Sequence, residues 1–191
     1  MGNETQAVMA PAAALTSAEL DFAAAYLAVT RDRLEEALKD LSEAQWNFKP
    51  SRERWSIAEN MEHIAIVEGR VQEIIKSMEQ APAEAPGRDV KQVDAAVLVA
   101  VSMRHPKYKA PDRISPLGGR TGRQALQDFL ANRARTAALL SSSPNLRGRV
   151  VPHPILGPWD GYQWILAAGA HSARHTGQVL EVKEEPNFPA H

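Results

Sequence analysis

The sequence predicts an all-α protein, a four-helix bundle with long interhelical loops and one short extra helix. Three observations support this fold class. Four long segments repeat apolar side chains at helical spacing, helix-capping residues precede them, and no stretch alternates polar and apolar residues as a half-buried strand does. The chain has 191 residues, of which 44% are hydrophobic, enough for one domain with a sizeable core. We expect a flexible N-terminal tail over residues 1–15 and a single bundle domain over residues 16–191.

The first predicted helix runs from about Ser17 to Leu41. Thr16 is its candidate N-cap, and Glu19 stands three residues later. This is the spacing of a capping box, in which two side chains satisfy orphan amides of the first helical turn. The face that we expect to be buried is marked by leucines at helical spacing: Leu20, Leu27, Leu34, Leu38 and Leu41.

The second predicted helix begins after Ser56, with Glu59 as its capping-box partner, and runs to about Glu79. The connector "APAEAPG" follows, and its Pro and Gly residues break the helix. After the connector, "VKQVDAAVLVAVSMR" (90–104) predicts the short extra helix. The apolar stripe of the second helix consists of Ile57, Met61, Ile64, Val71, Ile75 and Met78.

The last two long helices also open with capping-box pairs. Thr121 and Gln124 begin a helix that ends at about residue 141. Asp160 and Gln163 begin the last helix, which ends at about residue 184, before a segment that contains two prolines.

Two long segments between the helices are predicted to be ordered loops. They are "HPKYKAPDRISPLGG" (105–119) and "SSSPNLRGRVVPHPILGP" (141–158), and neither shows a strand pattern. A minimal four-helix bundle needs only short connections, and loops of this length tend to carry function.

The composition excludes several classes of function. The 22 basic and 23 acidic side chains nearly cancel, so there is no electrostatic reason to expect nucleic acid or a membrane surface as a partner. No apolar run approaches the roughly 20 residues of a membrane span, and the N-terminal segment lacks the basic start of a signal peptide. The absence of cysteine excludes disulfides, thiolate metal ligands and a protein thiol nucleophile. We expect a cytoplasmic protein.

A pair of histidines in the last helix suggests a metal site. His171 and His175 are four residues apart, so they lie one turn above each other on one helix face. Two such imidazoles can converge on one cation, or they can be partly buried and bonded to backbone or carboxylate groups. His63 points into the bundle from the second helix, and bundle proteins build metal sites from facing helices. Three neutral imidazoles leave a coordination position open, as in catalytic zinc sites.

The usual catalytic base of a zinc protease is missing. The sequence has no H-E-x-x-H motif, so a hydrolase here would activate water with the metal alone or use a base from a loop, such as His105 or His153. Arg133 and Arg174 are candidates for binding an anionic substrate group. The alternative for each is a solvated helix face or an ion pair with a neighbouring turn.

Three stretches of the chain resemble the DinB-like (damage-inducible) superfamily of metal-dependent hydrolases. They are "WSIAENMEHI" (55–64), "HPILGPWDGYQWILAAGAHSARHTGQVLEVK" (153–183) with its H-x-x-R-H-x-x-Q core, and "NFP" close behind. This resemblance implies a four-helix bundle in which His63, His171 and His175 surround one divalent transition metal. Three imidazoles accept several metals, and we expect zinc or nickel.

Three further residues near the predicted site have two interpretations each. Glu59 either orients the metal ligand His63 through a hydrogen bond to its carboxylate or serves only as the capping partner of Ser56. Gln178 either contacts a substrate or packs between helices, and Trp164 either lines the site or belongs to the core. Trp55 is expected to pack at the end of the bundle.

The residues and the resemblance leave three functional hypotheses. The first is a metal-dependent hydrolase of a small molecule, and the second, also implied by the resemblance, is a transferase or isomerase that uses a low-molecular-weight thiol as cosubstrate. The third is a non-enzymatic, stress-related bundle that binds a metal. Family members often form dimers, and the apolar content permits a homodimer without requiring one. The sequence does not define the substrate.

Overall fold

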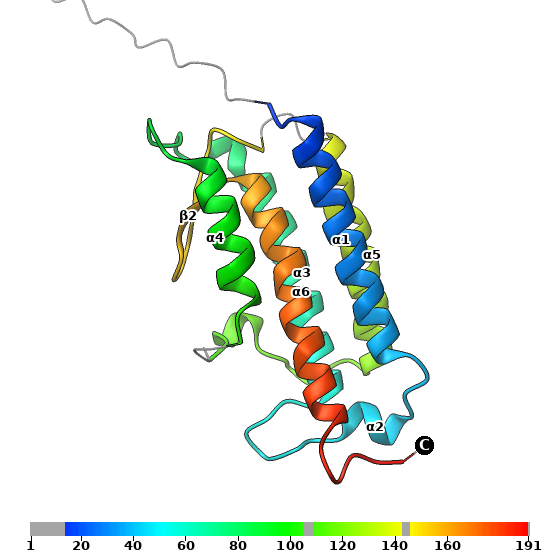
Figure 1. Cartoon of the computed structure of the whole chain (residues 1–191). Coiled ribbons are helices and arrows are strands. Elements are labelled where there is room, and N and C mark those ends of the chain that lie inside the picture. Colours follow the sequence, from blue (N-terminus) through cyan, green and yellow to red (C-terminus); the bar gives the residue numbers. More distant parts are fainter. Residues whose placement is uncertain (1–13, 105–108, 143–145, 191) are drawn as a thin grey trace, which may run out of the picture.

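The computed structural model describes residues 14–104, 109–142 and 146–190, and it confirms the four-helix bundle. The bundle consists of α1 (Ser17–Leu38), α3 (Ile57–Ser77), α5 (Gly122–Ser142) and α6 (Gly161–Lys183). Around the bundle the neighbours follow the order α1, α6, α3, α5 and back to α1, as seen in Figure 1. The predicted tail at residues 1–15 lies almost entirely outside the described residues and stays a prediction.

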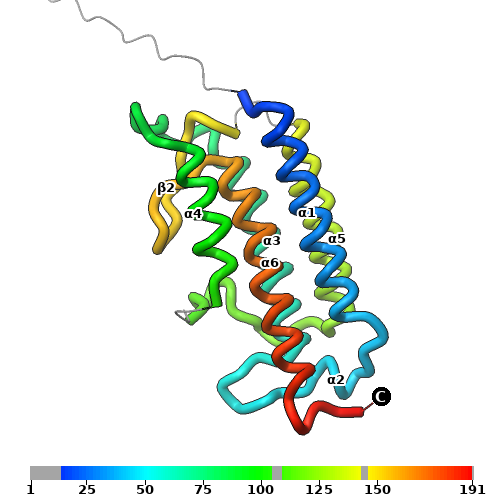
Figure 2. Tube along the Cα trace, viewed as in Figure 1, coloured from blue at the N-terminus to red at the C-terminus, as the bar shows by residue number. Residues whose placement is uncertain are grey.

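A fifth helix covers the outside of the bundle. The predicted short extra helix is α4 (Val90–Ser102), which packs against α6. The trace in Figure 2 shows α6 between α1 and α4. Consequently α6 has helices on three sides, which explains why its sequence is apolar on more than one face. None of the helices in the described residues has the length and apolar character needed to cross a membrane.

The predicted capping boxes form at all four long helices. Thr16 with Glu19, Ser56 with Glu59, and Asp160 with Gln163 make both reciprocal hydrogen bonds at α1, α3 and α6. At α5 the Gln124 amide donates to Thr121 Oγ1 at 3.2 Å, and the Thr121 amide donates to Gln124 Oε1 at 3.0 Å. These side chains fix where each helix begins, because they satisfy amides that have no partner inside the helix.

The end of the first helix was predicted too late. The helix ends at Leu38, and Asp40 adopts a left-handed backbone with φ of 55°. A further capping box, Ser42 with Gln45, then begins the short helix α2 (Glu43–Asn47), which was not predicted. Leu41 is still buried, so its place in the leucine stripe reflects core packing rather than helix. At the end of α3 the chain continues into a 3₁₀ turn, η1 (Met78–Gln80).

The prediction that the chain has no strands was wrong in the second long loop. That loop contains an antiparallel hairpin of β1 (Val151–His153) and β2 (Gly157–Trp159), with Pro152 opposite Pro158. Strands of three residues are too short to show alternation, and proline is usually rare in strands because it cannot donate to the ladder. The first long loop contains only a 3₁₀ turn, η2 (Asp112–Ile114), among its described residues.

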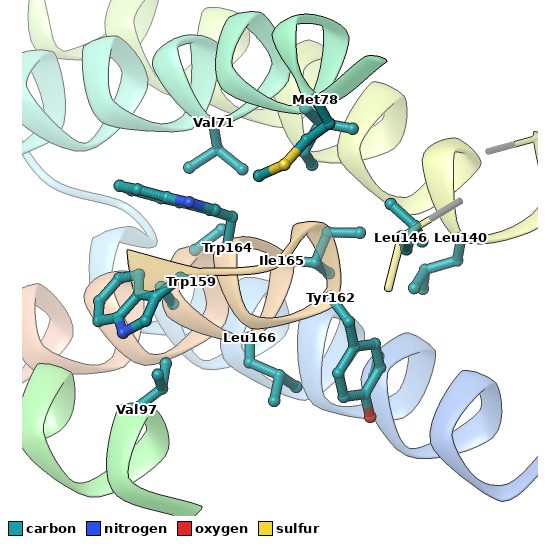
Figure 3. Close-up of a cluster of buried hydrophobic side chains, with 14 of the residues drawn as sticks. Val71, Met78, Val97, Leu140, Leu146, Trp159, Tyr162, Trp164, Ile165 and Leu166 are labelled. Carbon is teal, nitrogen blue, oxygen red and sulfur yellow. The ribbon is translucent and has the colours of Figure 1, made fainter. Parts of the chain in front are cut away.

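A layer of polar side chains separates two apolar clusters along the bundle. The first cluster surrounds the beginning of α6, where Trp164 lies beside Val71 and Trp159 in Figure 3. The second cluster lies toward α2 and includes Trp46. The C-terminal segment joins it, because Phe188 packs against the cluster and the Pro189 carbonyl accepts a hydrogen bond from Gln45 of α2. Between them each long helix contributes a buried polar residue to the layer: Thr30 from α1, Glu68 from α3, Arg133 from α5 and Ser172 from α6.

Candidate metal centre

Three imidazoles converge beside this polar layer. His63 comes from the second turn of α3, and His171 and His175 come from successive turns of α6. One nitrogen of each ring lies within 4.8 Å of the others, and the Nε2 atoms of His63 and His171 are 3.0 Å apart. His63 and His175 are buried, whereas His171 is partly exposed. The neighbouring positions of α3 and α6 in the bundle therefore bring together residues that are 108 positions apart.

The spacing of these nitrogens fits one transition metal. Two imidazole nitrogens at the usual zinc distance of about 2.0–2.1 Å, in tetrahedral geometry, are about 3.3–3.4 Å apart. The separation of 3.0 Å between His63 and His171 differs from this by only a few tenths of an ångström. Small side-chain movements are thus sufficient to place both nitrogens at coordination distance.

The outer nitrogens of two rings are held by the protein. His63 Nδ1–H donates to the carbonyl oxygen of Ile114 at 2.7 Å, and His175 Nδ1–H donates to Asn60 Oδ1 at 3.0 Å. The Asn60 amide is itself oriented, because its Nδ2 donates to the carbonyl oxygen of Ser56. Such partners fix the tautomer and leave the Nε2 lone pair available for a metal.

The same bonds assign the protons when no metal is bound. A carbonyl oxygen only accepts, so His63 carries its proton on Nδ1 and its Nε2 is an acceptor. His171 Nε2–H is consequently the donor in the 3.0 Å contact with His63. Metal binding requires this proton to leave His171 Nε2.

Burial keeps the three imidazoles neutral. Desolvation is the largest cause that lowers the pKa of His63, and it lowers the pKa values of His171 and His175 well below the usual range. The positive charge of Arg174 adds to this effect at each ring. Since only the neutral imidazole binds a metal, the site is in the required protonation state near neutral pH.

Trp55, which was expected to pack at the end of the bundle, also contacts the site. Its ring centroid lies 4.9 Å from that of His63 and 6.3 Å from that of His175, and it stacks on His175 with an interplanar angle of 19°. Trp55 immediately precedes Ser56, the N-cap of α3. From this position the Trp55 side chain reaches His63 in the second turn of the helix. The W-S-x-x-E-x-x-x-H spacing was the available signal in the sequence.

The other predicted residues lie in different surroundings. Glu59 caps Ser56 and accepts from Lys49 Nζ at 2.7 Å; burial alone would raise its pKa, but these hydrogen bonds lower it. Trp164 is buried in the first apolar cluster, with its ring 5.0 Å from Trp159 and 5.6 Å from His153. The structure therefore favours a capping role for Glu59 and a core role for Trp164. Gln178 is partly buried on α6, and its contact with a substrate stays a prediction.

Arg133 is neither a solvated residue nor available to a substrate. Its Nε and Nη2 donate to the two carboxylate oxygens of Glu68, both at 2.9 Å, and each side chain is only 2% exposed. Further hydrogen bonds reach the hydroxyl of Thr30 and the hydroxyl of Ser172, which follows His171. The helical pattern could not reveal this, because the partner Glu68 lies on another helix, 65 positions away.

Comparison with known proteins identifies the family. The family model of the DinB superfamily matches residues 26–179. The uncharacterized protein YuaE of Bacillus subtilis (strain 168) is 32% identical over 151 residues, which cover 78% of this chain and 89% of that protein. The solved structure of YfiT from Bacillus subtilis, described as "a probable metal-dependent hydrolase with an unusual four-helix bundle topology", shares the fold, with a TM-score of 0.61, 14% identity and 95% of each chain covered. The chain belongs to the DinB superfamily.

Proposed function

We propose that this protein binds one divalent transition metal through His63, His171 and His175 and hydrolyses a small molecule at that site. The observation that carries the proposal is the convergence of three neutral imidazoles, two of them oriented through their outer nitrogens. YfiT, which has the same fold, is described as a probable metal-dependent hydrolase. Three imidazole ligands suit zinc or nickel.

The residues of the chain supply binding and orientation in this reaction. A divalent metal supplies Lewis acidity and makes water acidic enough to act as a nucleophile near neutral pH. Asn60 and the Ile114 carbonyl hold two ligands in the tautomer that binds a metal. Trp55 packs against the rings of His63 and His175.

Metal content tests the first part of the proposal. Elemental analysis of tag-free protein should find about one divalent metal per chain, and the His63→Ala and His171→Ala variants should lose it. His153→Ala is the matched control, because His153 stacks on Trp159 in the hairpin and is not one of the three converging residues. Wild-type protein that holds no metal after incubation with zinc and with nickel contradicts the proposal.

Turnover tests the second part. An activated ester should be hydrolysed by the metal-loaded protein and not by the His63→Ala variant, with no requirement for added thiol. If turnover appears only with an electrophile and a low-molecular-weight thiol, the protein is a transferase instead. If neither reaction occurs although one metal is bound, the metal has a structural or other non-enzymatic role.

A further inference from the structure

The charged side chains that lower the pKa values of the three imidazoles are arginines. After burial, the groups that lower the pKa values of these rings are the imidazoles themselves and arginines: Arg174 acts on all three, Arg104 on His175 and Arg133 on His171. Of these arginines, Arg133 is paired with Glu68 and Arg104 with Glu181.

The nearby acidic side chains are engaged with other groups. Each of four carboxylates on α3 and α6 has a partner: Glu59 pairs with Lys49, Glu62 accepts from the Gly118 amide, Glu68 pairs with Arg133, and Glu181 pairs with Arg104. None of them lies in the group of converging imidazole nitrogens. A divalent metal held by three neutral ligands would thus keep its full double positive charge.

Arg104 reaches from the end of α4 onto α6. Its Nε and Nη2 donate to the carboxylate of Glu181 at 3.0 and 2.5 Å. Its Cδ lies 3.9 Å from where a Cβ would stand on Gly177, so the side chain lies directly against α6. Its remaining Nη1 is buried and has no hydrogen-bond partner within residues 14–104, 109–142 and 146–190. A buried guanidinium N–H in this state is costly unless a ligand supplies an acceptor.

Helix geometry places both arginines on the same side of the imidazoles. Arg174 and Glu181 are seven residues apart on α6, so they share one face, and this face is next to the one that carries His171 and His175. Arg104, which binds Glu181, lies along this face. Two guanidinium groups therefore flank the side of the site that faces α4.

We propose that the substrate is anionic and that Arg104 and Arg174 bind its carboxylate or phosphate group while the three imidazoles hold the metal; this inference rests on the proposed function. Guanidinium groups suit both anions, because their N–H donors match pairs of oxygen atoms. An anionic group also offsets the positive charge of the metal, which would repel a cationic substrate.

Calorimetric titration of the metal-free and the zinc-loaded protein tests this inference without an activity assay. Inorganic phosphate, acetate and the neutral analogue acetamide are titrated at constant ionic strength into wild-type protein and into Arg104→Gln and Arg174→Gln variants. Arg31→Gln is the matched control, because the Arg31 side chain is 40% exposed and pairs with Asp32 on the same helix, α1. Circular dichroism checks that each variant is folded, and elemental analysis measures its metal content.

We expect saturable binding of phosphate or acetate to the wild type and to Arg31→Gln, and no binding of acetamide. Affinity should fall by about tenfold or more in both Arg104→Gln and Arg174→Gln, as for a lost hydrogen bond between charged groups. Equal affinity in all variants, or no saturable anion binding, overturns the inference. Protein that holds a metal but no anion refutes only this inference, whereas anion binding by protein that cannot hold a metal refutes only the proposed function.

Discussion

Replacement of Arg133 by methionine tests how strongly the polar layer contributes to stability. Arg133 and Glu68 are each 2% exposed and share two hydrogen bonds of 2.9 Å. Methionine keeps much of the side-chain length but leaves the Glu68 carboxylate buried without its cation. Removing one partner of a buried ion pair costs about 3–5 kcal/mol. We expect the free energy of unfolding of Arg133→Met to fall by about this amount.

A second variant separates the lost charge partner from the lost packing. In the double variant Arg133→Met with Glu68→Leu neither charge of this pair remains, and apolar replacement of a buried pair is often neutral or stabilising. The double variant should therefore be more stable than Arg133→Met alone by about 2 kcal/mol or more. Arg31→Met is the control, because its ion pair with Asp32 is exposed and worth at most about 1 kcal/mol.

Urea unfolding of metal-free protein, followed by circular dichroism, measures all four proteins under the same conditions. A loss of less than about 1 kcal/mol in Arg133→Met contradicts the prediction. A double variant that is less stable than the single one also contradicts it, because the cost would then come from packing and not from an unpaired carboxylate.

Three further predictions concern the helix contacts and the metal site. Gly169→Ala should lower the urea midpoint, since a Cβ there would lie 2.7 Å from the Tyr26 ring, whereas Gly177→Ala should leave it unchanged or raise it, since the nearest atom would be 3.9 Å away. The free energy of unfolding of the metal-free protein should be greatest above about pH 6.5 and should fall as the pH drops. The cause is that the pKa values of His171 and His175 are lowered in the folded protein, so that the unfolded chain binds more protons. At about pH 5.5 each imidazole lowers the stability by at most about 1.4 kcal/mol, and urea midpoints that do not change with pH would contradict this. Zinc at about 100 times its dissociation constant should stabilise the wild type by about 2.7 kcal/mol and leave His171→Ala unchanged in thermal unfolding.

The helix positions were predictable because local side chains determine them. Thr16, Ser56, Thr121 and Asp160 each have a partner three residues later, and a helix begins at each of these pairs. The same rule applied to Ser42 and Gln45 would have revealed α2, which the continuing leucine stripe obscured. The hairpin was missed because its strands have three residues each and contain Pro152 and Pro158.

The contacts around the imidazoles were less predictable because they join distant segments. Asn60 and His175, which form a hydrogen bond, are 115 positions apart. The hydrogen bond of His63 is accepted by the backbone carbonyl of Ile114, and a backbone carbonyl cannot be predicted from the type of residue. Arg133 shows the same limit, since nothing in its own helix indicates Glu68 as its partner. The family motif identified the three histidines but not the groups that orient them.

The position of α6 has a consequence for how the chain folds. This helix is the last of the described helices, yet it contacts α1, α3 and α4 and carries two of the three converging histidines. During synthesis the earlier helices therefore emerge without the element that they surround, and their apolar faces stay incomplete until α6 follows. Since the contacts between α1 and α6 close a loop of more than about 100 residues, formation of the bundle depends on a slow, non-local step. Shortening the chain within α6 should for this reason disrupt both the core and the cluster of three histidines, and not only one end of the molecule.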